Sequence, residues 1–422
     1  MINKNVLSLK QSATLLINEK VKDLRKEGRT ISHFGFGQSP FPIFPSIVAS
    51  LQQHADNNHY LPVAGLESLR EHIVSFLAKE QGIHTTKEAV FIGPGSKELL
   101  YQTILIFEAE YLIPKGSWVS YIPQIQSKGG TYHILDTDLE HDFKLTAHAL
   151  EAFLIDQPKE KEFVLILNSP NNPTGTVYSL EEYKALAEVC KKYSIMVMSD
   201  EIYSQINFNQ PYSPSISAHY PEGTIVFGGL SKVFSAGGYR LGYMMLPEKL
   251  KDLQNVYKSL FSETFSCVSS PVQYAAINAY EYQKDLKQYV ADSSAILKGV
   301  SAFMYDEFTK VGVQCTRSEG AFYMVIGFNT FKKQLSEMNV RTSSNLAHYI
   351  LEHFGVAMLP GVDFGFQEEE LFFRLAFVDF DGANVMDAYQ KGSKIDALFI
   401  KEHCPSIYNG VTQVQAFVKS ME

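Results

Sequence analysis

Polar residues follow three short apolar runs in the middle of the chain, and their types are those that bind ligands or carry out chemistry. The apolar runs span residues 163–167, 195–198 and 224–227. Asn172 comes soon after the first run, Asp200 after the second and Lys232 after the third. A lysine amine can attack a carbonyl carbon, and a carboxylate beside a basic nitrogen favours the protonated form of that nitrogen. These segments are therefore the first candidates for a reactive site.

The same runs indicate which elements hold these residues. All three lack polar alternation, and a helix-like stretch from Leu180 to Tyr193 separates the first two. Alternating strands and helices predict a parallel sheet whose two faces are covered by helices. In such sheets ligands bind at the carboxyl ends of the strands, so we expect the polar residues that follow each run to meet at one edge.

Two further segments indicate that anions are bound. Gly93–Leu100 reads Gly-Pro-Gly-Ser-Lys-Glu-Leu-Leu, a glycine-rich turn that opens a helix, where free backbone N–H groups and the helix dipole favour an anion. Arg374 lies within the apolar run Phe372–Phe377, where a guanidinium is costly unless it meets an anion. Taken singly, the segments named so far also fit turns, helix caps, solvated loops or ion pairs.

Taken in order along the chain, these segments resemble the class I and II aminotransferases, which are pyridoxal-phosphate enzymes of fold type I. The segments that carry the resemblance are Gly93–Leu100, Asn168–Gly175, Ser199–Tyr203 and Gly228–Arg240, and it extends over nearly the whole chain. The resemblance implies an α/β fold. It consists of a large domain with a mixed, mostly parallel sheet covered by helices, and a smaller α+β domain.

The C-terminal part of the chain has the pattern of the smaller domain. We expect a charged helix over 285–308, strands over 322–326 and 372–377, and a helix over 345–354. The resemblance places residues 46–295 in the large domain, and residues 1–45 and 296–422 in the small domain. Residues 397–422 extend past the usual end of the family, and we expect them to cover the small domain.

The resemblance assigns roles around the cofactor ring to four residues. Lys232 occupies the position that forms the Schiff base with pyridoxal phosphate and later moves the substrate proton. Asp200 matches the carboxylate that keeps the pyridine nitrogen protonated. Asn172 and Tyr203 match the pair that hydrogen-bonds the 3-oxygen of the ring.

A second group matches the contacts to the cofactor phosphate and to the face of the ring. The phosphate-binding residues implied by the resemblance are Gly95, Ser96, Lys97, Ser231 and Arg240. Trp118 matches the aromatic residue that stacks on the pyridine ring, with Tyr121 as the alternative. Gly229 departs from the family, because many members have a serine there whose hydroxyl binds the phosphate.

Three residues match positions that bind the substrate, and one matches a contact between subunits. Arg374 corresponds to the arginine that binds the substrate α-carboxylate, Gly37 to the glycine whose N–H joins it, and Asn172 to a further substrate contact. The neighbouring Gln38-Ser39 departs from the usual Glu-Pro. Tyr60 corresponds to a tyrosine that reaches the phosphate of the other protomer, which implies a homodimer.

Transamination between an L-amino acid and a 2-oxo acid is the activity that the resemblance implies. Lys97 favours aspartate or glutamate as the donor, because some relatives use a lysine there for the distal carboxylate, although it also fits a phosphate contact. A broad-range or aromatic donor is the alternative, since the segments that usually select the side chain, near Ile17 and between Phe261 and Ser270, are not decisive.

The same cofactor residues also serve C–S lyases, which carry out α,β-elimination. The most distant alternative is a regulator that only senses pyridoxal phosphate or an amino acid. Such regulators carry a DNA-binding domain before this fold, whereas here the resemblance begins near Ser12.

Composition argues against several other classes of protein. The 422 residues include 37 basic and 46 acidic residues, a net charge of −9 with no basic block, which argues against nucleic-acid binding. The four cysteines are far apart and no histidines have metal-ligand spacing, so we expect neither disulfides nor a metal site. Widely spaced cysteines also favour a reducing compartment. We find no signal peptide and no apolar run of membrane length, and therefore expect a cytoplasmic protein without a membrane partner.

Overall fold

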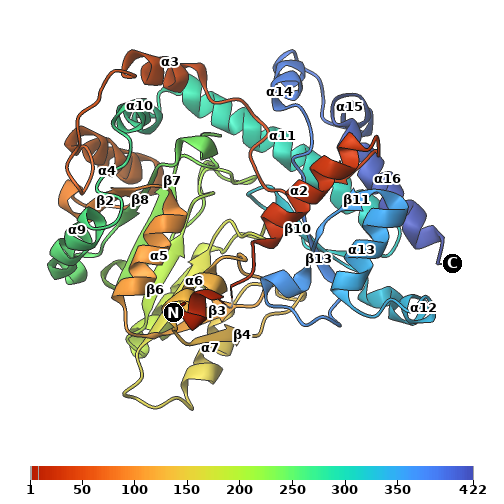
Figure 1. The fold of residues 1–422 in the computed structure, drawn as a ribbon, viewed down its shortest axis with the longest axis horizontal. Helices are drawn as coiled ribbons and strands as arrows, with labels where there is room; N and C mark the ends of the chain where they lie inside the picture. Colours follow the sequence, from red (N-terminus) through yellow and green to blue (C-terminus); the bar gives the residue numbers. More distant parts are fainter. Residues whose placement is uncertain (1, 8, 422) are drawn as a thin grey trace.

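The larger of the sheets has seven strands and is mixed but mostly parallel, as predicted (Figure 1). The computed structural model describes residues 2–7 and 9–421. The strands, in their order across the sheet, are β2 (Val90–Gly93), β8 (Gly242–Met245), β7 (Thr224–Gly229), β6 (Met196–Asp200), β5 (Phe163–Asn168), β3 (Glu110–Pro114) and β4 (Tyr132–Leu135). From β7 to β4 neighbouring strands are parallel, while β8 is antiparallel to both β2 and β7.

Alternate residues of the central strands face two separate hydrophobic cores. In β5, Val164 and Ile166 pack into one core, while Leu165 and Leu167 pack into the other. Because both faces are buried, these strands carry no polar alternation, which is the pattern that predicted them. The three predicted strands are confirmed as β5, β6 and β7, and the predicted helix after the first of them is α8.

Helices cover both faces of the large sheet and surround the smaller one. Their bounds are α1 (Lys4–Leu7), α2 (Ala13–Lys26), α3 (Pro45–Gln53), α4 (Glu67–Gln81), α5 (Ser96–Ile106), α6 (Tyr121–Lys128), α7 (Ala147–Leu154), α8 (Leu180–Lys192), α9 (Gln254–Ser262), α10 (Ser270–Glu281), α11 (Lys284–Thr309), α12 (Lys332–Glu337), α13 (Ser343–Phe354), α14 (Gly382–Gln390), α15 (Ala397–His403) and α16 (Pro405–Lys419). Within the described residues, no helix is both long enough and apolar enough to cross a lipid bilayer.

The smaller sheet has four strands and lies on the side of the molecule that also holds the C-terminus (Figure 1). Its order is β12 (Leu359–Pro360), β13 (Phe372–Ala376), β10 (Tyr323–Gly327) and β9 (Gln314–Cys315). A separate pair joins β1 (Ser32–His33) to β11 (Val356–Ala357) in parallel. The two longer strands and the helix that the sequence predicted in this region are confirmed as β10, β13 and α13.

The division into two domains stays a prediction, and two features of the fold bear on it. The predicted boundary after residue 295 falls inside α11, a helix of 26 residues. One hydrophobic core is also continuous across the boundary, from Leu69 and Ile73 of α4 to Phe417 and Val418 of α16. The two sheets are therefore joined by a shared core and a shared helix.

The ends of the chain pack on different parts of the fold. The C-terminal helix α16 contacts α11, α13 and β1, and it buries Ile407, Val411 and Val414, so the extension packs on the helices and the β1–β11 pair beside the smaller sheet. At the N-terminal end, β1 pairs with β11 and α2 contacts β12 of the smaller sheet. Helix α1, however, contacts α6 beside the large sheet. The assignment of residues 1–45 to the small domain therefore stays a prediction, with α1 packed against a helix of the large sheet.

Candidate active site

A cavity of about 370 Å³ lies at the carboxyl ends of β5, β6 and β7. Of the residues that the sequence singled out, those lining it are Gly37, Ser96, Lys97, Trp118, Asn172, Asp200, Tyr203, Ser231, Lys232, Arg240 and Arg374. The residues that follow β5, β6 and β7 meet there because parallel strands end at the same edge of the sheet, and Gly37 and Arg374 join them from outside that sheet.

Asp200 is the last residue of β6. Its carboxylate is buried, and only one of its two oxygens has a hydrogen-bond partner. The Tyr121 hydroxyl donates to Oδ2 at 2.8 Å, whereas Oδ1 has no hydrogen-bond partner. Burial raises the pKa of Asp200 to about 6, although the Tyr121 hydrogen bond and the nearby Lys232 act in the opposite direction. A buried oxygen without a partner is costly, so this carboxylate is suited to a protonated group in the cavity.

Lys232 extends into the cavity from the loop after β7. Its Nζ donates to the Gly37 carbonyl oxygen at 2.8 Å and lies 5.7 Å from the centre of the Tyr203 ring. Burial lowers the pKa of this amine to about 8, and the charges of Arg374, Lys97 and Arg240 add to that effect. A lysine whose pKa is lowered in this way spends more time as the neutral amine, which is the nucleophilic form.

Arg374, on β13, is only 1% exposed, and its polar partners within the described residues are neutral. Nη1 donates to Asn172 Oδ1 at 3.5 Å and Nη2 donates to the Gly35 carbonyl at 2.5 Å, while Nε has no partner. The strand Phe372–Ala376 is otherwise apolar. A buried guanidinium with neutral partners is suited to bind a carboxylate through two parallel hydrogen bonds.

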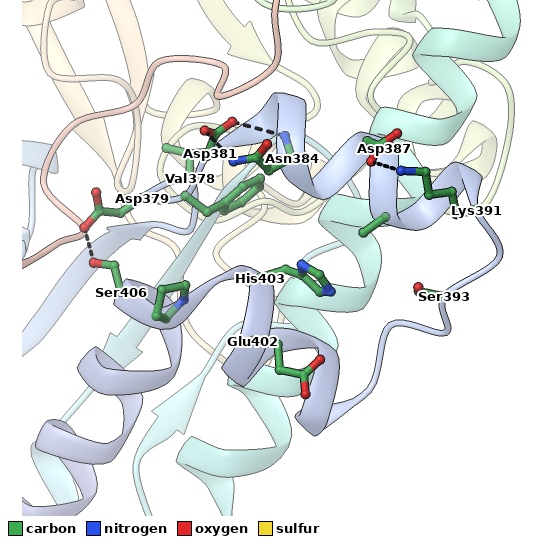
Figure 2. Close-up of a pocket in the computed structure, with 13 residues that line it drawn as sticks. Val378, Asp379, Asp381, Asn384, Asp387, Lys391, Ser393, Glu402, His403 and Ser406 are labelled. Carbon is green, nitrogen blue, oxygen red and sulfur yellow. Dashed lines mark hydrogen bonds and ion pairs between the residues drawn. The ribbon is translucent and has the colours of Figure 1, made fainter.

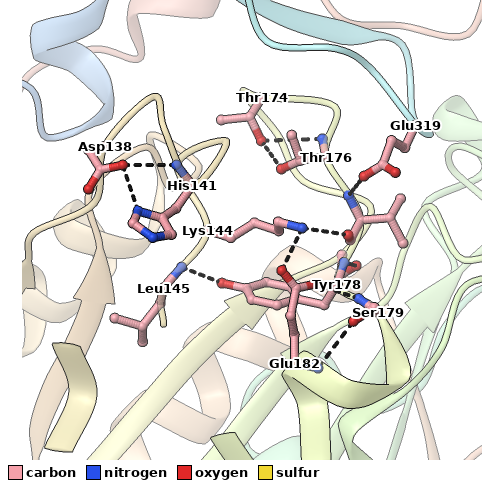
Figure 3. Close-up of polar contacts among 12 residues, drawn as sticks. Asp138, His141, Lys144, Leu145, Thr174, Thr176, Tyr178, Ser179, Glu182 and Glu319 are labelled. Carbon is pink, nitrogen blue, oxygen red and sulfur yellow. Dashed lines mark hydrogen bonds and ion pairs between the residues drawn. The ribbon is translucent and has the colours of Figure 1, made fainter. Parts of the chain in front are cut away.

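The loop that carries Asn172 is held on both sides by polar contacts (Figure 3). On one side the Leu145 N–H donates to Tyr178 Oη at 2.8 Å, and Lys144 pairs with Glu182 at 2.7 Å. On the other side the Val177 N–H donates to Glu319 at 3.1 Å. These contacts fix a segment without regular secondary structure at the edge of the cavity.

Two cationic side chains, Lys97 from the first turn of α5 and Arg240 from the segment between β7 and β8, lie at one end of the cavity. Gly95 has φ 95°, and a Cβ at this position would lie 2.4 Å from Nη2 of Arg240, so a side chain here would collide with the guanidinium. The Lys97 ammonium lies 4.8 Å from the centre of the Trp118 ring. Burial, and to a lesser extent Arg240, lowers the pKa of Lys97. This end of the cavity can therefore accept a strongly charged anion.

Two of the predicted residues do not line the cavity. Gly95 shapes its edge through the close approach of Arg240, but Tyr60 lies elsewhere on the surface and is 89% exposed. Trp118 lines the cavity, whereas its alternative Tyr121 is fully buried and instead contacts Asp200. Gly229 has no space for the family's serine, because a Cβ would lie 2.8 Å from the Leu241 carbonyl oxygen.

Several cavity residues were not singled out from the sequence. Near one candidate segment for donor selection, Ile17 does not line the cavity, but Ser12, Thr14 and Leu15 do; residues 261–270 do not line it. Tyr323, on β10, also lines it and contacts both Tyr203 and Arg374. The Gly-Ala-Phe-Tyr sequence before β10 was the only available signal for Tyr323, and it reads as an ordinary apolar strand.

Comparisons with known proteins agree with this arrangement. A model of the family "Aminotransferase class I and II" matches residues 29–388. The aspartate aminotransferase of Geobacillus stearothermophilus is 32% identical over 371 residues, which cover 86% of this chain and 91% of that protein. The asparagine–oxo-acid transaminase of Streptococcus mutans is 29% identical, over 87% of this chain and 93% of the relative.

Solved structures show the same fold over almost the full length. The aspartate aminotransferase of Thermus thermophilus, solved with maleate, has a TM-score of 0.84 at 23% sequence identity, covering 99% of both chains. The family model, the relatives and the fold therefore agree. The chain belongs to the class I and II aminotransferases, a family of pyridoxal-phosphate-dependent enzymes.

Proposed function

We propose that this aminotransferase moves the amino group of an acidic L-amino acid, of the aspartate or glutamate type, to a 2-oxo acid, with pyridoxal phosphate bound through Lys232. The observation that carries the proposal is the charge of the cavity. Four cationic side chains line it, those of Lys97, Lys232, Arg240 and Arg374, and among its lining residues only Asp200 is acidic. The cofactor phosphate and a dicarboxylic substrate supply the anions that match this excess.

The residues present fit pyridoxal phosphate. The unpartnered Oδ1 of Asp200 suits the protonated ring nitrogen, and the turn at Gly95 together with Arg240 suits the phosphate. When bound, this cofactor withdraws electrons and stabilises negative charge at the substrate α-carbon. Lys232 supplies an amine that holds or releases a proton at Nζ, and Asn172 and Tyr203 supply further hydrogen-bond groups in the same cavity.

Two cationic groups favour an acidic donor. Arg374 has a buried guanidinium suited to the α-carboxylate, and Lys97 provides a partly desolvated ammonium for the distal carboxylate. The names of the relatives support the same class, since the G. stearothermophilus protein is an aspartate aminotransferase. If Lys97 binds the phosphate instead, the donor range is broad.

The proposal extends to the assembly and the location of the enzyme. Tyr60, a large aromatic residue that is 89% exposed, suits a contact with the phosphate site of a second copy, and the active enzyme is then a homodimer. The four cysteines are free, which supports a reducing cytoplasm.

The test is the visible spectrum of the protein with pyridoxal phosphate, recorded before and after single amino acids are added, with 2-oxoglutarate added last. A band that bleaches with aspartate or glutamate and returns with 2-oxoglutarate is the expected result. Release of pyruvate and ammonia from one amino acid without an acceptor identifies a lyase instead. Absence of any cofactor band overturns the roles of Lys232 and Asp200.

Lys97→Met tests the donor class. We expect kcat/KM for aspartate to fall about tenfold or more, the value of one charge-assisted hydrogen bond, while alanine is affected much less. A loss of pyridoxal-phosphate affinity with equal effects on all donors assigns Lys97 to the phosphate. Lys391→Met, at an exposed lysine paired with Asp387, is the matched control.

A further inference from the structure

Tyr323 has contacts that the roles assigned so far leave unused. It is the first residue of β10, it is 1% exposed, and it lines the cavity. Its hydroxyl oxygen lies 3.0 Å from that of Tyr203, and the two rings meet edge to face with centres 5.8 Å apart. A tyrosine buried in an apolar strand with its hydroxyl on another tyrosine is placed to orient that second hydroxyl.

The Tyr323 hydroxyl also lies near the carbonyl oxygen that accepts a hydrogen bond from the lysine. It lies 3.4 Å from the Gly37 carbonyl oxygen, which accepts a hydrogen bond from Lys232 Nζ at 2.8 Å. The approach depends on the absence of a side chain at Gly37, because a Cβ there would lie 2.2 Å from the Tyr323 hydroxyl oxygen. The loop at Gly37, the lysine and the two tyrosines therefore form one connected group.

The ring of Tyr323 contacts the substrate end of the cavity. Strands β10 and β13 are antiparallel, with Val325 opposite Arg374, so Tyr323 and Arg374 are diagonal neighbours on the same face. The Arg374 Cζ atom lies 5.0 Å from the centre of the Tyr323 ring, a distance at which the ring attracts the cation. One side chain thus touches a group on each side of the cavity.

We propose that Tyr323 is a positioning residue, whose hydroxyl directs the Tyr203 hydroxyl into the cavity and whose ring holds the guanidinium of Arg374 in place for a carboxylate. The proposal rests on the proposed function, since it concerns residues that act on pyridoxal phosphate and the amino acid. The hydroxyl of Tyr323 therefore acts on Tyr203 and its ring acts on Arg374, and different substitutions can separate the two effects.

The direction of the hydrogen bond follows from the number of protons available. Each tyrosine has one hydroxyl proton, and Tyr203 can donate into the cavity only if it does not donate to Tyr323. Tyr323 must then donate its own single proton to Tyr203, at 3.0 Å, rather than to the Gly37 carbonyl oxygen, at 3.4 Å, and by donating it makes the Tyr203 hydroxyl a stronger donor. Removing the Tyr323 hydroxyl weakens that donation but leaves the ring against Arg374.

The first test compares Tyr323→Phe with Tyr323→Leu in the protein loaded with pyridoxal phosphate. For Tyr323→Phe we expect the pH midpoint of the visible band to rise by about 0.5–1 unit, the size of one hydrogen bond, with KM for the amino acid nearly unchanged. For Tyr323→Leu we expect the same rise together with a several-fold higher KM. Tyr280→Phe is the control, because Tyr280 is buried with an unpartnered hydroxyl outside the cavity.

The second test is a double-mutant cycle with Tyr203→Phe. If Tyr323 acts through Tyr203, adding Tyr323→Phe to Tyr203→Phe moves the pH midpoint no further. The role of Tyr323 is overturned if the shifts of the two variants add, or if Tyr323→Phe has the same midpoint as the wild type. In either case a wild-type protein that still forms the band leaves the proposed function intact. A wild type that forms no band with pyridoxal phosphate instead overturns the proposed function itself.

Discussion

Two cavities of this molecule differ in how their charged residues are paired. The larger one, about 910 Å³, lies beside α14 and the C-terminal helices (Figure 2). Most of its charged side chains have partners: Asp387 pairs with Lys391 at 2.6 Å, Asp381 caps α14, and Asp379 accepts from Ser406, whereas the exposed Glu402 has none among the described residues. In the cavity of about 370 Å³, by contrast, Arg374 is buried with neutral partners and Asp200 has an unpartnered oxygen.

The contrast shows that buried charged groups without a partner, rather than a large cavity volume, distinguish the reactive site. Burying a charge without an opposite charge costs free energy, so such groups persist where a ligand pairs with them. In the larger cavity the exposed side chains of Asp387 and Lys391 neutralise each other, and the exposed carboxylate of Glu402 is solvated, so neither needs a ligand. The predictions below test this difference.

The largest effect is expected from Lys232→Ala. Since this removes the amine that we propose bonds the cofactor and moves the proton, we expect transamination to fall by at least about 10²–10⁴-fold. Pyridoxal phosphate still binds through the remaining contacts, which equilibrium dialysis of the variant measures. Turnover close to that of the wild type would contradict the assignment of Lys232.

Arg374→Lys is expected to have the next largest effect. Lysine keeps the charge but cannot form two parallel hydrogen bonds with a carboxylate, so KM for the amino acid rises about 10–10²-fold. Steady-state kinetics with aspartate measure the change, and the cofactor spectrum without substrate serves as the control. An unchanged KM would mean that Arg374 is a structural residue of β13.

The buried amine of Lys232 predicts a pH-dependent stability of the cofactor-free protein. Its pKa falls from 10.5 to about 8 in the folded state, so between these values the unfolded chain holds a proton that the folded chain has released. Stability therefore rises with pH in this window, with a contribution approaching about 1.4 kcal/mol per pH unit, and is lost as the pH falls through 8. Urea denaturation of Lys232→Met across pH 7.5–10.5 should lack this contribution.

The smallest effect is expected in the larger cavity. Asp387→Asn breaks the ion pair with Lys391, but both side chains are mostly exposed, at 63% and 72%. We expect an unchanged kcat/KM and a small change in the urea midpoint, because solvent screens such pairs. A clear loss of transamination would show that the two cavities are coupled, and the contrast between them would fail.

The residues next to the central strands were predictable because their signal is local. An apolar run without alternation predicted β5, and the polar residues after it, including Asn172, had to lie at its carboxyl end. Lys232 and Asp200 were found in the same way. Tyr323 gave no such signal, since within its own strand it reads as one more buried aromatic residue.

The sequence by itself determined the order of strands and helices, the family, and the residue types that can hold a cofactor and bind a carboxylate. Only the tertiary structure decided which of those groups share a cavity, that Tyr121 supports Asp200, and that Tyr323 joins Tyr203 to Arg374. Strand and helix patterns arise from neighbours in the chain, whereas these contacts join residues of different elements. Their geometry therefore depends on how the two sheets pack around α11 and their common core.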